Sequence, residues 1–158
     1  MEAHGLALQR DTSRCIAALT EAERAFDRFS TGSGPEWLNY FDDSYLAAKF
    51  AHTFRDLGYP FEAERFARRS LEMTDGYDRG RLFNTALLAS TLADQGRVDE
   101  ACAAASTAVR MTDTARSVRS GAYLADVGRR LAPDSNDSRV KACTSRWAAP
   151  AYLRRRSS

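Results

Sequence analysis

The sequence predicts an all-α protein built from antiparallel helical hairpins, with about seven helices. Three observations support this prediction. Apolar residues recur at steps of three and four along most of the chain, which is the period of a helix. A corner at Leu57 and Gly58 divides residues 37–73 into two such helices. The pattern of this stretch then returns 38 residues later and ends at Met111.

The central hairpin has recognisable start and stop signals. Its first helix is expected over residues 36–57, after Ser33, Gly34 and Pro35, because a proline in the first helical turn loses no hydrogen bond. Gly58 ends this helix, since glycine adopts a positive φ without steric cost. A second helix is expected from Pro60 to Met73. The apolar positions of the two helices are Trp37, Tyr40, Phe41, Ala47, Phe50, Ala51, Phe54, Phe61, Ala63, Phe66, Ala67, Ser70, Leu71 and Met73.

The second copy preserves the corner and the small residues of the first. Its identities fall where helices must approach closely, while other positions keep only their apolar character. The matched pairs are Gly58 with Gly96, Glu62 with Glu100, Ala63 with Ala101, Ala67 with Ala105, Phe50 with Leu88, Ala51 with Ala89, Phe54 with Leu92, and Met73 with Met111.

Residues 3–30 are expected to form an incomplete unit. Asp11 and its neighbours can cap a helix that runs to about Arg28, so residues 3–10 would be the tail of a preceding helix. A chain that starts partway through a repeat favours a fragment of a longer protein, and the alternative is a short natural first helix. The expected apolar stripe is Cys15, Ile16, Leu19, Ala22 and Phe26.

The last part of the chain predicts two more helices. One begins near Ser117 and ends before Pro133, and a closing helix follows a cap at Asn136 and Asp137. The repeat units are therefore about 3–30, 36–73, 79–111 and 115–149, in one domain over residues 1–150, and residues 151–158 form a disordered tail. The expected inward positions are Val118, Ala122, Leu124, Val127, Leu131, Val140, Cys143 and Trp147.

The hairpin pattern resembles the tetratricopeptide repeat. In that family a pattern of large and small residues lies on the first helix, before a glycine corner. Small residues follow on the second helix. The resemblance implies a right-handed superhelix of hairpins whose first helices line a concave groove. The period of 38 residues and the absence of the family's first-helix tryptophan, replaced by Ala47 and Thr85, mark a degenerate member. The matching residues are Phe50, Ala51, Phe54, Gly58, Ala63, Ala67 and Ser70, then Leu88, Ala89, Leu92, Gly96, Ala101, Ala105 and Ala108.

A second resemblance covers nearly the whole chain. Residues 37–42, 54–58, 116–119 and 129–133 are similar to the C-terminal half of XRE-type helix-turn-helix regulators of Streptomyces. This resemblance implies transcription regulation in an actinobacterium, with contact to DNA only through an N-terminal domain that this chain lacks. The excess of arginine over lysine agrees with such a GC-rich source, since Lys49 and Lys141 are the only lysines.

Composition limits the function classes. A net charge of +2 is too small to indicate nucleic-acid binding, and no run approaches the roughly 20 apolar residues of a membrane helix. Three dispersed cysteines without metal-ligand spacing fit a reduced, cytoplasmic protein. No nucleophile–histidine constellation or phosphate loop is present, so the sequence predicts no enzyme activity, no metal and no cofactor.

The groove implied by the tetratricopeptide resemblance supplies the candidate site. Aromatic rings can hold an apolar group there, and His52 and Arg55 can hold an acceptor or an anion. The same residues also fit ordinary packing or solvated charge, and that alternative remains open. The family's carboxylate clamp needs Lys and Asn where Ala48 and His52 stand. The groove positions are Tyr45, Ala48, His52, Arg55 and Asp56, then Phe83, Ala86, Ser90, Ala93 and Asp94.

Three functions compete at this point. The first is a regulatory module that senses a peptide, a small effector or a protein partner. The second is a protein–protein interaction or homodimerisation scaffold without a small ligand. Direct nucleic-acid binding, through residues such as Arg154–Arg156 near the C-terminus, is the third and weakest.

Overall fold

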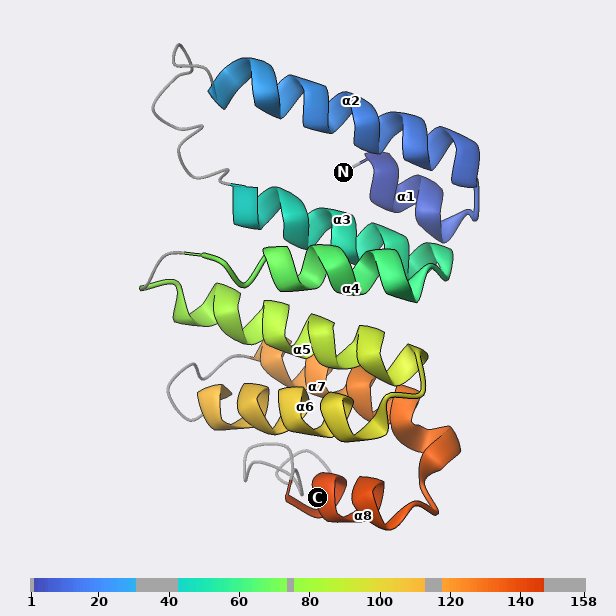
Figure 1. The fold of residues 1–158 in the computed structure, drawn as a ribbon, viewed down its shortest axis with the longest axis vertical. Coiled ribbons are helices and arrows are strands. Elements are labelled where there is room, and N and C mark those ends of the chain that lie inside the picture. Colours follow the sequence, from blue (N-terminus) through green and yellow to red (C-terminus); the bar gives the residue numbers. More distant parts are fainter. Residues whose placement is uncertain (1, 31–42, 74–75, 113–117, 147–158) are drawn as a thin grey trace. The chain divides into compact units, whose positions relative to one another are not determined.

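The computed structural model describes residues 2–30, 43–73, 76–112 and 118–146 (Figure 1). Within these ranges all regular secondary structure is helical, with eight α-helices and one short 3-10 helix, so the predicted all-α class is confirmed. The chain divides into two compact units, residues 1–74 and residues 75–158, each of which we describe by itself. The expectation of a single domain over residues 1–150 stays a prediction.

Unit 1 contains two helical hairpins. Helix α1 packs against α2, and both α1 and α2 contact α3, which pairs with α4. The main-chain amide of Arg14 donates to the carboxylate of Asp11 at 3.2 Å, so Asp11 caps α2 as the sequence predicts. The helices are α1 (Glu2–Leu8), α2 (Thr12–Ser30), α3 (Asp43–Leu57) and α4 (Pro60–Arg69).

Phenylalanines and alanines fill the contact between α3 and α4. Phe66 packs edge-on against Phe50, with ring centroids 5.1 Å apart, and stacks on Phe54 at 5.4 Å. Ala51 and Ala63 have no exposed surface, which lets the two helices approach closely. The repeat's small residues therefore occupy the helix–helix seam, as expected from their preservation in both copies.

Unit 2 is centred on α5. This helix packs against α6 and α7, and α6 also contacts α7 and α8. From residue 84 to residue 93 every side chain of α5 is buried, around the whole circumference of the helix. The hydroxyl of Thr91 donates to the carbonyl of Leu88 at 2.8 Å, so this polar group is satisfied in the interior. The elements are α5 (Asp78–Asp94), α6 (Val98–Thr112), α7 (Val118–Leu131), the 3-10 helix η2 (Ala132–Asp134) and α8 (Ser138–Arg146).

The two predicted glycine corners are equivalent. Gly58 has φ of +84° and Gly96 has φ of +71°, in the left-handed region that other residues avoid. In each corner the glycine amide donates to the carbonyl three residues back, and the next amide donates to the carbonyl five residues back, which is the Schellman pattern. The bonds are Gly58 to Arg55 (3.0 Å), Tyr59 to Phe54 (2.9 Å), Gly96 to Ala93 (2.9 Å) and Arg97 to Leu92 (3.0 Å).

We expect Gly96→Ala to destabilise the protein by about 1–2 kcal/mol, because an L-residue in the left-handed region is strained. Gly128→Ala is the matched control: this glycine lies inside α7 with a negative φ, and a Cβ there would meet nothing within 4 Å. The control should stabilise the protein by about 0.5–1 kcal/mol, since alanine is the better helix former. Urea unfolding followed by circular dichroism measures both. If the two substitutions changed the stability equally and in the same direction, the assignment of Gly96 to a left-handed corner would be wrong.

Several sequence expectations were wrong in detail. Helix α4 ends at Arg69 rather than Met73, because the amides of Leu71 and Glu72 turn back to carbonyls three residues earlier. Phe61 is 70% exposed, since it lies on the opposite side of α4 from the buried Ala63. In the same way Ala122 on α7 is exposed, although it was expected to face inward. The predicted helix start at residues 33–42 and the residue Trp147 lie outside the described residues.

Asp137 caps α8, as the sequence predicts. Its carboxylate accepts from the main-chain amide of Arg139 at 2.8 Å and from the guanidinium of the same residue at 3.0 Å. These hydrogen bonds lower the pKa of Asp137 from 3.8 to about 2, and the bond from the Arg139 side chain has the larger effect. A carboxyl group whose pKa is lowered by folding stabilises the folded state at pH values above its ordinary pKa. This contribution is lost as the pH falls through the pKa of the group in the folded state.

Acidification from pH 4 to pH 2 should therefore weaken the start of α8, within the window set by the pKa values of 3.8 and about 2. A carbon-detected NMR titration of the Asp137 carboxyl group and amide exchange in α8 would measure this. The Asp137→Asn variant keeps a capping oxygen but does not titrate, so its α8 should lack the change in this window. A normal Asp137 midpoint near 3.8 would contradict the assignment.

None of the helices within the described residues is long and apolar enough to cross a membrane.

Candidate functional site

The ten predicted groove residues divide equally between two helices, α3 and α5. Tyr45, His52 and Arg55 lie on one side of α3 in unit 1, because steps of seven and three residues return to the same face of a helix. Phe83, Ser90 and Asp94 share one side of α5 in unit 2, because steps of seven and four residues do the same. A groove that joins the two sets stays a prediction.

On α3, a lysine extends the predicted face. The ammonium of Lys49 lies 5.1 Å from the centre of the Tyr45 ring, in a cation–π contact one helical turn along. His52 is half-buried on the same side. The face therefore presents an amine, a phenol and an imidazole, a combination that suits a ligand with an anionic group.

Arg55 is less available for an anion than the sequence suggests. Its guanidinium lies 3.0 Å and 3.2 Å from a carboxylate oxygen of the adjacent Asp56. The two side chains are only 12% and 13% exposed. Because Asp56 offsets the positive charge of Arg55, the pair as a whole carries no net charge toward a ligand.

On α5, the predicted residues contact α7. The ring of Phe83 stacks on Tyr123, with centroids 5.0 Å apart and planes 22° apart. Ser90 is fully buried, and its hydroxyl lies 3.1 Å from the carbonyl oxygen of Ala86 and 3.4 Å from a carboxylate oxygen of Asp126. Both side chains therefore contact α7, and for Phe83 this is the packing that the sequence left open beside a role in the groove.

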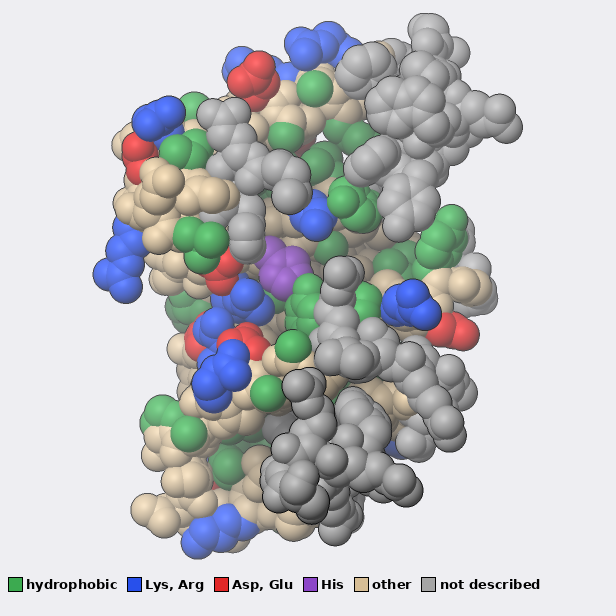
Figure 2. All heavy atoms as spheres, turned by 180° about the vertical axis from the view of Figure 1, so that it is seen from behind, with side chains coloured by type: hydrophobic (Ala, Val, Ile, Leu, Met, Phe, Trp, Pro, Cys, Tyr) green, Lys and Arg blue, Asp and Glu red, His purple; other side chains and the backbone are tan. Residues whose placement is uncertain are grey.

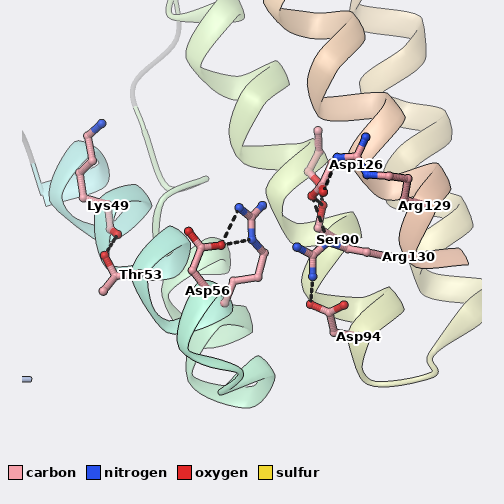
Figure 3. A network of polar contacts seen from close by, with 10 residues as sticks. Lys49, Thr53, Asp56, Ser90, Asp94, Asp126, Arg129 and Arg130 are labelled. Atoms are coloured by element: carbon pink, nitrogen blue, oxygen red, sulfur yellow. Dashed lines mark hydrogen bonds and ion pairs between the residues drawn. The ribbon is translucent and has the colours of Figure 1, made fainter. Parts of the chain in front are cut away.

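Asp94 belongs to a polar network between α5 and α7 (Figure 3). Arg130 forms ion pairs with Asp94 and, at 3.0 Å, with Asp126, and Arg129 also binds Asp126 at 3.0 Å. About a quarter or less of the side chains of Arg130, Asp94 and Asp126 is exposed. Burial lowers the pKa of Arg130, but its hydrogen bonds and charge interactions with the two carboxylates raise that pKa above the ordinary value.

Sequence reasoning missed the α7 partners Tyr123, Asp126 and Arg130. A signal for two of them was present, since Asp126 and Arg130 follow Ser90 and Asp94 by 36 residues each, close to the repeat length. Their own spacing of four residues also favours an ion pair on one helix. Tyr123 has no such counterpart, so its contact with Phe83 could not be predicted.

Unit 1 contains one further feature, a cavity of about 20 Å³ bounded by α2, α3 and α4. This volume holds about one water molecule. None of the ten predicted groove residues lines it. Its walls include Phe26, Asp27, Asp43, Phe50, Phe66 and Arg69.

Charged side chains of both signs are interspersed over the face shown in Figure 2. Among the described residues, no three His, Cys, Asp or Glu side chains gather in a way that could hold a metal ion. Comparison of the chain with protein-family models, with curated proteins and with solved structures finds no match. The resemblances to tetratricopeptide repeats and to XRE-type regulators therefore depend on the sequence patterns given above.

Proposed function

We propose that this protein is a non-enzymatic regulatory binding module with a tetratricopeptide-like arrangement of hairpins. The observation that carries the proposal is the equivalence of Gly58 and Gly96, which turn two hairpins of matching pattern with the same hydrogen bonds. Contacts between first helices, α1 with α3 and α5 with α7, also support it, because such hairpin stacks pack in this way. The module would serve a transcriptional regulator whose DNA-binding domain is absent from this chain.

The face of α3 is the best candidate for ligand contact. Tyr45, Lys49 and His52 offer an aromatic surface beside hydrogen-bond donors, which fits a peptide or small effector with a carboxylate or phosphate group. The α5 positions contribute less, since Phe83 and Asp94 are engaged by α7. We therefore place recognition mainly on unit 1 and assign the α5–α7 contact a structural role.

A ligand should raise the melting temperature of the protein. Binding to the folded state alone contributes about 2.7 kcal/mol when the ligand is at 100 times its Kd. Scanning fluorimetry with panels of acidic peptides and phosphorylated metabolites would find such a ligand. We expect Tyr45→Ala and His52→Ala to lose the shift and Tyr59→Ala to keep it, because Tyr59 lies at the exposed hairpin corner.

The alternative is a protein–protein interaction or homodimerisation scaffold with no small ligand. The engagement of Phe83, Ser90 and Asp94 within unit 2 favours it, because these side chains contact α7 instead of an effector. Light scattering separates the two proposals. A tight dimer that responds to no panel member supports the scaffold, whereas a monomer with a ligand-dependent melting temperature supports the sensor.

Two observations test the regulatory context. A gene sequence that continues upstream of Met1 into a helix-turn-helix would support the link to transcription. If this chain itself bound DNA, retention on a duplex would fall steeply with salt. If the protein is not retained on the duplex at any salt concentration, direct nucleic-acid binding is excluded.

A further inference from the structure

Two of the three cysteines meet at one helix contact. Cys102 on α6 and Cys143 on α8 are both buried in unit 2. The thiol of Cys143 donates to the main-chain carbonyl oxygen of Cys102 at 3.6 Å, although the residues are 41 positions apart. Cys15 is in unit 1, where its thiol lies 3.2 Å from the carbonyl oxygen of Ala3.

The side chain of Cys143 on α8 lies against the main chain of Cys102 on α6. An S–S bond requires Cα atoms about 4.4–6.8 Å apart, a separation found only where two packed helices face each other directly. Helices α6 and α8 are in such contact. The sulfur of Cys143 lies 3.6 Å from the main-chain carbonyl oxygen of Cys102, so joining the two sulfurs requires rotation of the Cys102 side chain and a shift of α8.

Local opening of α8 gives an oxidant access to both thiols. The helix has nine residues, and helices of this length are marginal without a packing partner. Its main packing partner in the described part of the chain is α6. A second tie is the ion pair of Arg139 with Asp99, at 2.7 Å, which is more than half exposed and therefore weak. Each opening of α8 exposes Cys102 and Cys143 together.

We propose that Cys102 and Cys143 form a redox-sensitive pair, which closes to an intramolecular disulfide when the protein meets a peroxide and so fastens α8 to α6. The thiolate of one cysteine attacks hydrogen peroxide, which yields a sulfenic acid and releases the other oxygen as water. The second thiol attacks the sulfenic sulfur and expels a second water. Two thiols and one peroxide give one disulfide and two waters, and a thiol reductant reverses the bond.

Treatment of the purified protein with hydrogen peroxide tests this proposal. After denaturation, the number of thiols that react with N-ethylmaleimide should fall from three to one. The mass of the unalkylated protein should fall by about 2 Da, the mass of the two hydrogens lost. Peptide mapping should find Cys102 joined to Cys143, and dithiothreitol should restore all three thiols.

Two variants sharpen the test. Cys15→Ser should form the same bond, because Cys15 takes no part in it, and Cys143→Ser should form no intramolecular bond. Amide exchange in α8 should slow on oxidation of the wild-type protein and stay unchanged in Cys143→Ser. Three alkylatable thiols after treatment, a bond to Cys15, or covalent dimers as the main product would overturn the proposal.

Discussion

Replacement of Leu131 by alanine is expected to destabilise unit 2 by about 2–5 kcal/mol, because it removes buried methyl groups and leaves a cavity. Leu131 is only 1% exposed and is the last residue of α7. Helix α7 packs against both α5 and α6, so the side chain lies in the interior of the unit. Urea unfolding followed by the helical circular dichroism signal would measure the loss.

Leu8→Ala provides the matched control for this substitution. Leu8 is also the last residue of its helix, but it is 67% exposed. Truncation of so exposed a side chain should change the stability by about 0.5 kcal/mol or less. A smaller loss for Leu131→Ala than for Leu8→Ala would show that α7 does not pack as described.

Arg130→Met should have the second largest effect, a loss of about 1–3 kcal/mol. The substitution keeps much of the side chain's volume but removes the charge that holds Asp94 and Asp126, whose side chains are about three-quarters buried. A double-mutant cycle with Asp94→Asn isolates the contact between α5 and α7. Its coupling energy should reach at least about 0.5 kcal/mol, as expected of directly interacting groups.

The neighbouring arginine is the natural control. Arg129 also binds Asp126, yet it is 70% exposed, so Arg129→Met should cost about 0.5 kcal/mol or less. High salt should reduce the effect of Arg129→Met more than that of Arg130→Met, because salt screens exposed charges most. If the two substitutions cost the same and respond alike to salt, the buried network does not stabilise unit 2.

The parts of the fold that could be predicted are those governed by local chemistry. The glycine corners could be predicted because glycine tolerates a positive φ, which Gly58 and Gly96 both adopt. The caps at Asp11 and Asp137 could be predicted because a short carboxylate accepts hydrogen bonds from the first amides of a helix. The end of α4 was harder to predict from the sequence, because the periodicity of apolar residues continues past Arg69, where the helix ends.

The candidate site was less predictable because it depends on how helices meet. Sequence patterns placed Ser90 and Asp94 on one face of α5, which the spacing alone determines. Whether Arg130 would reach that face depends on the register of α7 against α5, and no local rule supplies that register. The same limit applies to Phe83 and Tyr123, two aromatic residues that could each have contacted other partners.

The burial of α5 around its whole circumference changes how sequence variation in this protein should be interpreted. Residues 84–93 of this helix have no open side and accept few replacements, whatever the protein binds. Invariance of Ser90 among homologues would therefore indicate dense packing rather than recognition of a ligand. The face of α3 with Tyr45 and His52 is the better place to look for selection by a ligand, because its side chains are only partly buried.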